Sequence, residues 1–239
     1  YGIELCELYG YEFENLYEKL EKDNDIKLKR VLSAKELFKS IMKTQLETGM
    51  PYIFFKDRAN EVNHNSHMGM IGNGNLCMES FSNFKPTINF VEEEDGNTSI
   101  RKSEMGEIHT CNLISLNLAE LTSDELEKHV ALAVRALDNT IDLTVTPLKE
   151  SNKHNLMYRT IGVGAMGLAD YLAREYMIYE ESINEINELF ERIALYSVKA
   201  SALLAKDRGA YKAFKGSKWD QAIFFGKKRE WYEANSKFK

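Results

Sequence analysis

Apolar residues recur at helical spacing between Ser33 and Gly49. At the first position Ser33 can accept a backbone hydrogen bond while Glu36 reaches back toward it, which is the pattern of a capping box. Gly49 can take the left-handed conformation that ends many helices, and the proline at position 51 blocks continuation. This stretch therefore predicts an amphipathic helix whose apolar stripe contains Leu37, Ile41 and Met42.

Three further stretches have the same helical period. Thr122 with Glu125, and Ser182 with Glu185, are two more capping boxes, and a glycine at position 209 can end the last helix. The expected helices cover residues 122–141, 167–174 and 182–209. The long ones carry apolar stripes, formed in the first by Leu126, Val130, Val134, Leu137 and Ile141 and in the last by Leu189, Ile193, Tyr196, Ala200 and Leu203.

Short apolar or alternating runs predict about four strands between these helices. They cover residues 52–55, 75–80, 109–118 and 157–163. Helices that alternate with single strands are typical of the α/β class. Four strands are few for a chain of 239 residues, so we expect strands from elsewhere to complete the sheet.

Two polar stretches have no clear period. Residues 56–74 predict a long loop, and the acidic residues 92–107 predict an exposed excursion. The remainder of the chain, residues 210–239, is basic and aromatic without a regular pattern.

Composition limits the class of protein. The net charge of −6 leaves no basic excess for binding a nucleic-acid backbone, and 44% hydrophobic residues indicate a globular chain. At roughly 100–200 residues per domain, the chain is one large domain or two small ones. No apolar run approaches the ~20 residues of a membrane span. Three cysteines do not form a disulfide framework and fit a reducing compartment, so we expect a cytoplasmic protein.

The stretch Gly162-Val-Gly164-Ala-Met-Gly167 has the spacing of a dinucleotide-binding glycine motif. That motif requires a second strand ending in an acidic residue about 20 positions further on. No Val- or Ile-rich strand follows here, so we interpret the glycines as sites of tight strand–helix packing.

A second motif is Asn75-Leu-Cys77-Met-Glu79. In an extended segment an amide, a thiol and a carboxylate would share one face. A carboxylate beside a thiol does not favour the thiolate, so the pattern is poor for a cysteine protease. It suits a thiol that reacts as neutral S–H or as a radical. Taken alone, however, the pattern favours a buried cysteine in a strand.

The third motif places Cys111 on the expected strand 109–118, too far from Cys77 for a C-x-x-C site. The histidines nearby, His64, His67 and His109, would need non-local assembly to bind a metal. We interpret them as solvated or hydrogen-bonded side chains.

Together, Asn-Leu-Cys-Met-Glu, the strand Cys-Asn-Leu-x-Ser-Leu-Asn-Leu and the stretch Arg159-Thr-Ile-Gly-Val-Gly-Ala-Met-Gly-Leu-Ala-Asp-Tyr-Leu172 resemble the large, catalytic subunit of class I ribonucleotide reductases. The resemblance covers nearly the whole chain. It implies a middle-to-C-terminal part of the family's ten-stranded α/β barrel, with residues 1–50 helical, 51–120 forming strands and a finger loop, and 121–239 mainly helical with one strand near 157–163.

The resemblance also implies roles for four residues. Cys77 matches the finger-loop cysteine that becomes a thiyl radical and abstracts the ribose 3′-hydrogen. Glu79 matches the general base for the 3′-hydroxyl, and Asn75 the amide that binds the ribose. Cys111 matches one member of the redox pair. Its family partner lies far upstream of the finger loop, and Cys6 does not match that motif.

The function implied is reduction of ribonucleoside diphosphates to deoxyribonucleotides. The family implies no cofactor on this chain. It implies three partners: a small subunit whose metal generates the radical, a reductant of the thioredoxin or glutaredoxin type, and the remaining part of the large subunit. The specificity loops, the diphosphate-binding turn and the radical-relay tyrosines of the family have no counterpart in this sequence. Two alternatives remain open at this point: the cobalamin-dependent class, which usually has Pro at the position of Leu76, and a non-catalytic α/β interaction domain.

Overall fold

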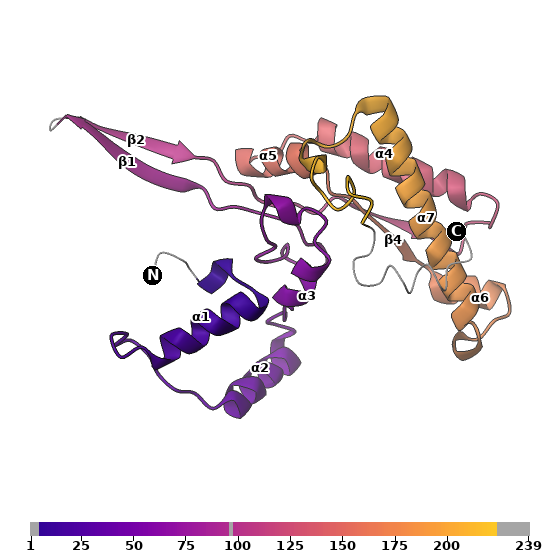
Figure 1. The fold of residues 1–239 in the computed structure, drawn as a ribbon. Coiled ribbons are helices and arrows are strands. Elements are labelled where there is room, and N and C mark those ends of the chain that lie inside the picture. Colours follow the sequence, from indigo (N-terminus) through magenta and orange to yellow (C-terminus); the bar gives the residue numbers. More distant parts are fainter. Residues whose placement is uncertain (1–4, 96–97, 224–239) are drawn as a thin grey trace.

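The computed structural model describes residues 5–95 and 98–223. Figure 1 shows three parts: a helical N-terminal part, a long two-stranded ribbon, and a body in which helices pack on a short parallel strand pair. Among the described residues, helices and strands mix in an α/β arrangement, as the sequence predicts.

The N-terminal part contains the short 3₁₀ helix η1 (Leu5–Glu7), helix α1 (Gly10–Lys22) and helix α2 (Ala34–Thr48). Helix α2 agrees with its prediction at both ends. The Ser33 side chain accepts a hydrogen bond from the Glu36 amide, and Gly49 is left-handed with a φ of 76°. Neither α1 nor α2, both fully described, contains a buried residue, so their apolar side chains are exposed or only half-buried.

Residues 52–55 do not form the expected strand. They follow α2 as irregular chain, and Phe54 instead stacks on the Phe81 ring with 5.1 Å between the centroids. The expected loop 56–74 contains helix α3 (Lys56–Glu61) and the 3₁₀ helix η2 (Ser66–Met68). The short apolar run has no described neighbouring strand to pair with, which is why its β propensity is not realised.

The acidic stretch is not a loop but most of a β-hairpin. Strands β1 (Ile88–Asp95) and β2 (Thr98–Glu104) pair antiparallel, from Ile88 opposite Glu104 to Asp95 opposite Thr98. Figure 1 shows this ribbon projecting away from the body, so the expected excursion is confirmed although its conformation is not. Glu107, at the end of the stretch, is buried rather than exposed.

A strand–helix–helix–strand unit forms the body. Strand β3 (Leu113–Asn117) pairs parallel with strand β4 (Gly162–Met166), and helices α4 (Leu126–Leu143) and α5 (Lys149–Tyr158) connect them. The expected strands 109–118 and 157–163 are therefore found in part. The second lies several residues later than predicted, because the preceding residues complete α5, an element that the sequence did not reveal.

Helix α6 (Leu168–Arg174), the 3₁₀ helix η3 (Tyr179–Glu181), helix α7 (Ile183–Arg208) and the 3₁₀ helix η4 (Lys212–Phe214) follow. The capping box at Ser182 is not formed. Its hydroxyl donates to the Ile178 carbonyl instead, with 2.6 Å between the oxygens. Of the α7 stripe, Ile193 and Ala200 are buried, whereas Leu203 is 58% exposed.

The core lies between the strand pair, α4 and α7. All five apolar residues expected on the α4 stripe are buried. Burying a side chain of this size contributes about 1.5–3 kcal/mol, so this helix face is a principal source of stability. The central cluster consists of Leu116, Leu118, Leu126, Val130, Ala133 and Ile193.

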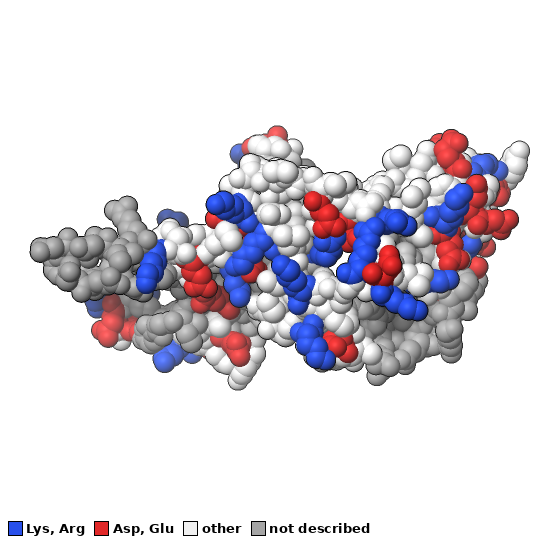
Figure 2. Space-filling view, turned by 90° about the horizontal axis from the view of Figure 1, so that it is seen from above, with Lys and Arg blue, Asp and Glu red and all other residues white. Residues whose placement is uncertain are grey.

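The described strands form two separate two-stranded sheets, so this part of the chain does not close a barrel by itself. Figure 2 shows basic and acidic side chains lying close together across one face rather than a surface of one sign. Within residues 5–95 and 98–223, no helix combines the length and apolar character needed to cross a membrane.

Candidate functional site

The segment around Cys77 is a tight turn, not the extended strand that the sequence predicts. An antiparallel bridge between Gly74 and Phe81 closes it. The Asn75 amide donates to the Ser80 carbonyl with 3.1 Å between the atoms. Because the chain reverses here, strict alternation of side chains does not apply, and the expectation of one shared face on a strand is wrong. We refer to residues 74–81 as the cysteine turn.

The cysteine turn nevertheless brings two of the candidate residues together. Asn75 Nδ2 donates to Glu79 Oε1 at 2.6 Å, and Asn75 Oδ1 accepts from the Ser80 amide at 3.1 Å. Cys77, midway between them in the chain, is exposed. An amide, a thiol and a carboxylate thus belong to one short turn, with the amide and the carboxylate held against each other.

Cys111 is also exposed, and it lies before β3 rather than on a strand. The next residue holds this segment in place. Asn112 accepts from the Gly162 amide through its carbonyl at 2.9 Å, and its side chain donates to the Thr160 carbonyl at 3.1 Å. The segment reaches the cysteine turn through His109, whose Nε2 lies 2.8 Å from Ser80 Oγ.

His109 belongs to a pair of histidines beneath the turn. Its ring centroid is 4.9 Å from that of His154, and His154 Nε2 lies 2.9 Å from Ser82 Oγ. Burial lowers the pKa of His109, partly opposed by the charge of Glu79. Burial, followed by the charge of His109, lowers the pKa of His154 to about 3. Both rings are therefore neutral near pH 7, and the expectation of a hydrogen-bonded His109 is confirmed.

A buried carboxylate anchors the base of the hairpin next to this pair. Tyr158 donates to Glu107 Oε2 at 3.1 Å, and Lys153 Nζ lies 3.4 Å from Glu107 Oε1. Burial and then the charge of Glu107 raise the pKa of the Tyr158 hydroxyl, which stays protonated as a donor. Sequence reasoning missed this group because the helix carrying Lys153 and Tyr158 had no recognisable apolar stripe.

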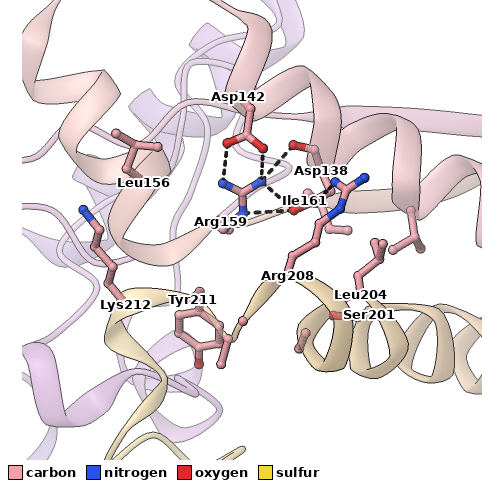
Figure 3. A pocket seen from close by; sticks show the side chains of 14 residues that line it. Asp138, Asp142, Leu156, Arg159, Ile161, Ser201, Leu204, Arg208, Tyr211 and Lys212 are labelled. Carbon is pink, nitrogen blue, oxygen red and sulfur yellow. Dashed lines mark hydrogen bonds and ion pairs between the residues drawn. The ribbon is translucent and has the colours of Figure 1, made fainter.

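A second polar site lies in a hollow of about 380 Å³ between α4, α5 and the end of α7. The Arg159 guanidinium lies 2.6 Å from Asp138 and 2.7 Å from Asp142, and Arg208 also binds Asp138 (Figure 3). The hydrogen bond from Arg159 lowers the pKa of Asp142. Since Arg159 is bound by both carboxylates and Arg208 is bound by Asp138, the cluster fastens helices together rather than offering a free cation to an anionic ligand.

The glycine stretch behaves as a packing element. A Cβ on Gly162 would lie 2.6 Å from a methyl group of Leu113, and one on Gly167 would lie 2.6 Å from Asn117 Oδ1. Gly167 also has a φ of 73°. Both close contacts are with strand β3, and a Cβ on Gly164 would meet its neighbours only at 3.5 Å or more. The interpretation as tight packing is therefore confirmed for Gly162 and Gly167, although the partner is a strand rather than a helix.

Metal ligands do not gather among the residues that the structure describes: no group of three or more His, Cys, Asp or Glu side chains is placed to hold an ion. His64 stacks on Trp219 with 4.7 Å between the ring centroids. Gly216 packs beside His67, whose ring carbon would lie 3.2 Å from a Cβ there.

Comparison with known proteins agrees with these motifs. The family model for the ribonucleotide reductase barrel domain matches residues 2–238. Ribonucleoside-diphosphate reductase subunit alpha of Synechocystis sp. is 47% identical over 238 residues, which are 98% of this chain and 29% of that protein. The subunit alpha of Helicobacter pylori is 36% identical over 92% of the chain and 33% of that protein. The large chain of Neurospora crassa is 33% identical over 92% of the chain and 22% of that protein.

This chain thus spans about a third or less of the length of these relatives. The match nonetheless covers nearly every residue, including the cysteine turn, the Cys111 segment and the glycine stretch. The chain belongs to the ribonucleotide reductase family and corresponds to a fragment of the barrel domain of its alpha subunit.

Proposed function

We propose that this chain supplies the radical cysteine, its carboxylate and amide neighbours, and one reducing thiol to a class I ribonucleotide reductase. The substrates are ribonucleoside diphosphates and the products are the corresponding deoxyribonucleotides. The observation that carries the proposal is the cysteine turn, in which Asn75 Nδ2 holds Glu79 Oε1 at 2.6 Å beside the exposed Cys77.

The three groups of the turn have different tasks. Cys77, as a thiyl radical, takes the hydrogen atom from the ribose 3′-carbon and becomes a thiol. Glu79 accepts the proton of the 3′-hydroxyl, a step that needs a carboxylate within hydrogen-bond reach. Asn75, whose amide group orients that carboxylate, also hydrogen-bonds the ribose. Because the Asn75 amide is neutral, it orients the Glu79 carboxylate without neutralising the negative charge.

Cys111 supplies part of the reducing power. Replacing the 2′-hydroxyl by hydrogen requires two electrons and two protons and releases water. Two thiols provide them by forming one disulfide bond. Cys111 is one of these thiols, and the second comes from the part of the large subunit outside this chain. A reductant of the thioredoxin or glutaredoxin type then restores both thiols.

The radical itself comes from a small partner subunit with a metal centre, as the family resemblance implies. When bound, that partner supplies the oxidising equivalent that converts the Cys77 thiol into a thiyl radical. The exposed position of Cys77 in the described part of the chain is compatible with access from substrate and from neighbouring parts of the assembly.

The test is Cys77→Ser in the complete enzyme, with Cys6→Ser as the matched control. Both cysteines are exposed, so neither change creates a core cavity. A serine hydroxyl is a poor radical carrier, so product formation with Cys77→Ser falls to background while Cys6→Ser is unaffected. Deoxyribonucleotide formation above a trace with Cys77→Ser refutes the radical assignment.

A further inference from the structure

Ser80 lies at the centre of the hydrogen bonds that shape the cysteine turn. Its amide donates to Asn75 Oδ1 at 3.1 Å, and its carbonyl accepts from the Asn75 amide at 3.1 Å. Its hydroxyl makes a third contact, to His109 Nε2 at 2.8 Å, which leaves the turn altogether. The position of Asn75 therefore depends on Ser80, and Ser80 is tied to a residue far along the chain.

His109 packs against a buried cluster of side chains around His154. Its ring lies against His154, which is fully buried, and the planes are inclined at 58°. His154 is fixed in turn by Ser82 Oγ at 2.9 Å and by contact with the Tyr158 ring, 4.7 Å between centroids. Side chains in such a buried cluster have few alternative rotamers. His109 is thus a rigid point to which the Ser80 hydroxyl can be attached.

The consequence reaches the proposed base. Asn75 donates to Glu79 at 2.6 Å, so a shift of Ser80 moves Asn75 and then the Glu79 carboxylate. We propose that His109 is a positioning residue that, through Ser80 and Asn75, fixes the Glu79 carboxylate beside Cys77. This inference rests on the proposed function, in which Glu79 accepts the substrate proton.

The contact uses a single nitrogen of the imidazole. Nε2 meets Ser80, whereas Nδ1 of His109 is buried with no hydrogen-bond partner among the described residues. A neutral side chain with one polar nitrogen at the Nε2 position can therefore replace histidine. Glutamine meets this requirement because its amide nitrogen can reach the same place, whereas leucine fills the space without offering a hydrogen bond.

The experiment compares His109→Leu, His109→Gln and Ser80→Ala, with His129→Gln on α4 as the matched control. His129 bonds to the Glu125 carbonyl of its own helix and is remote in sequence from the turn. The first measurement is amide hydrogen exchange of Asn75 and Ser80 in the complete large subunit. Loss of one hydrogen bond should speed this exchange roughly five-fold in His109→Leu and in Ser80→Ala. The double variant should be no faster than either single one, because both remove the same contact.

The second measurement is steady-state turnover of the complete enzyme. A misplaced carboxylate costs transition-state stabilisation, so kcat should fall about ten-fold or more in His109→Leu and Ser80→Ala, while KM changes less than about two-fold. His109→Gln should restore both kcat and amide protection. If His109 had only a structural role, His109→Gln would not restore kcat. Ser80→Ala would then also not reproduce the fall in kcat seen with His109→Leu.

Three results overturn the inference: unchanged exchange in Ser80→Ala, additive effects in the double variant, or a kcat for His109→Leu equal to that of His129→Gln. Ser80→Ala keeps the test decisive if His109→Leu does not fold. Failure of the proposed function is seen separately, as activity of Cys77→Ser, and leaves the exchange result interpretable.

Discussion

Replacing Gly167 by alanine perturbs the junction between β4 and α6 in two ways. Gly167 has a φ of 73°, and an L-residue in that conformation costs roughly 1–2 kcal/mol. The added Cβ would also lie 2.6 Å from Asn117 Oδ1, which accepts a hydrogen bond from the Ala119 amide at 3.3 Å. Displacing that oxygen loses about 1 kcal/mol more. We expect Gly167→Ala to lower the free energy of unfolding by about 2–3 kcal/mol.

Gly164→Ala is the matched control from the same stretch. A Cβ there would meet Ser115 Oγ at 3.5 Å and the Ile114 carbonyl at 3.8 Å, which are ordinary contacts. Replacing glycine where the backbone allows it reduces the entropy of the unfolded chain and changes stability by less than about 1 kcal/mol. If the stretch bound a dinucleotide, Gly164 would face the pyrophosphate, and its replacement by alanine would weaken dinucleotide binding.

Thermal unfolding followed by circular dichroism measures the difference. For a chain of this size each kcal/mol shifts Tm by about 2–4 °C, so Gly167→Ala should lower Tm by roughly 5–10 °C, well beyond the shift for Gly164→Ala. Titration with NAD or FAD should give no saturable micromolar binding. Equal Tm shifts, or micromolar binding lost on Gly164→Ala, would show that the packing argument is wrong.

Three other predictions concern the thiols, the buried histidine and the sheet edges. Cys111→Ser should abolish reduction while radical chemistry on the substrate continues, seen as base release or inactivation; normal reduction with a dithiol contradicts the assignment. The pKa of His154 is lowered to about 3, so the unfolded chain binds more protons than the folded one between about pH 3 and 6.5. Stability should therefore fall as pH drops through that window, by up to about 1.4 kcal/mol per pH unit, and His154→Gln should flatten the profile. Finally, the chain alone should be inactive and marginally stable. Its Tm should rise with the concentration of an added polypeptide that carries the rest of the large subunit. A cooperative, concentration-independent melt above ~60 °C for the chain alone contradicts this prediction.

The elements that the sequence predicted well are those determined by local chemistry. Ser33 and Gly49 mark the ends of α2 because capping depends on residues within a few positions. The α4 stripe from Leu126 to Ile141 is buried as expected, because a helical period of apolar residues needs only one partner surface. Ser182 shows the limit of such patterns, since its hydroxyl donates to the preceding Ile178 carbonyl instead of accepting from a backbone amide of α7.

Strands and site geometry depended on partners that no local pattern contains. Residues 88–95 became a strand because residues 98–104 fold back on them, despite an acidic composition that suggests a loop. The run 75–80 became a turn through contacts between Asn75, Glu79 and Ser80. The residue types of the candidate site were therefore predictable from the motif, whereas the hydrogen bond between Asn75 and Glu79 and the support from His109 were not.

The paired register of the β1–β2 ribbon makes it a natural place to change the length of the protein. Phe90 lies opposite Lys102 and Asn89 opposite Ser103, so shortening both strands by matched pairs keeps the backbone ladder of the remaining residues. The base of the ribbon is held independently, by the Lys85–Glu107 bridge and by Thr87 Oγ1 on Glu150 at 3.0 Å. A trimmed hairpin, or one carrying a fluorescent label or an affinity tag at its far end, should leave the body of the protein unchanged.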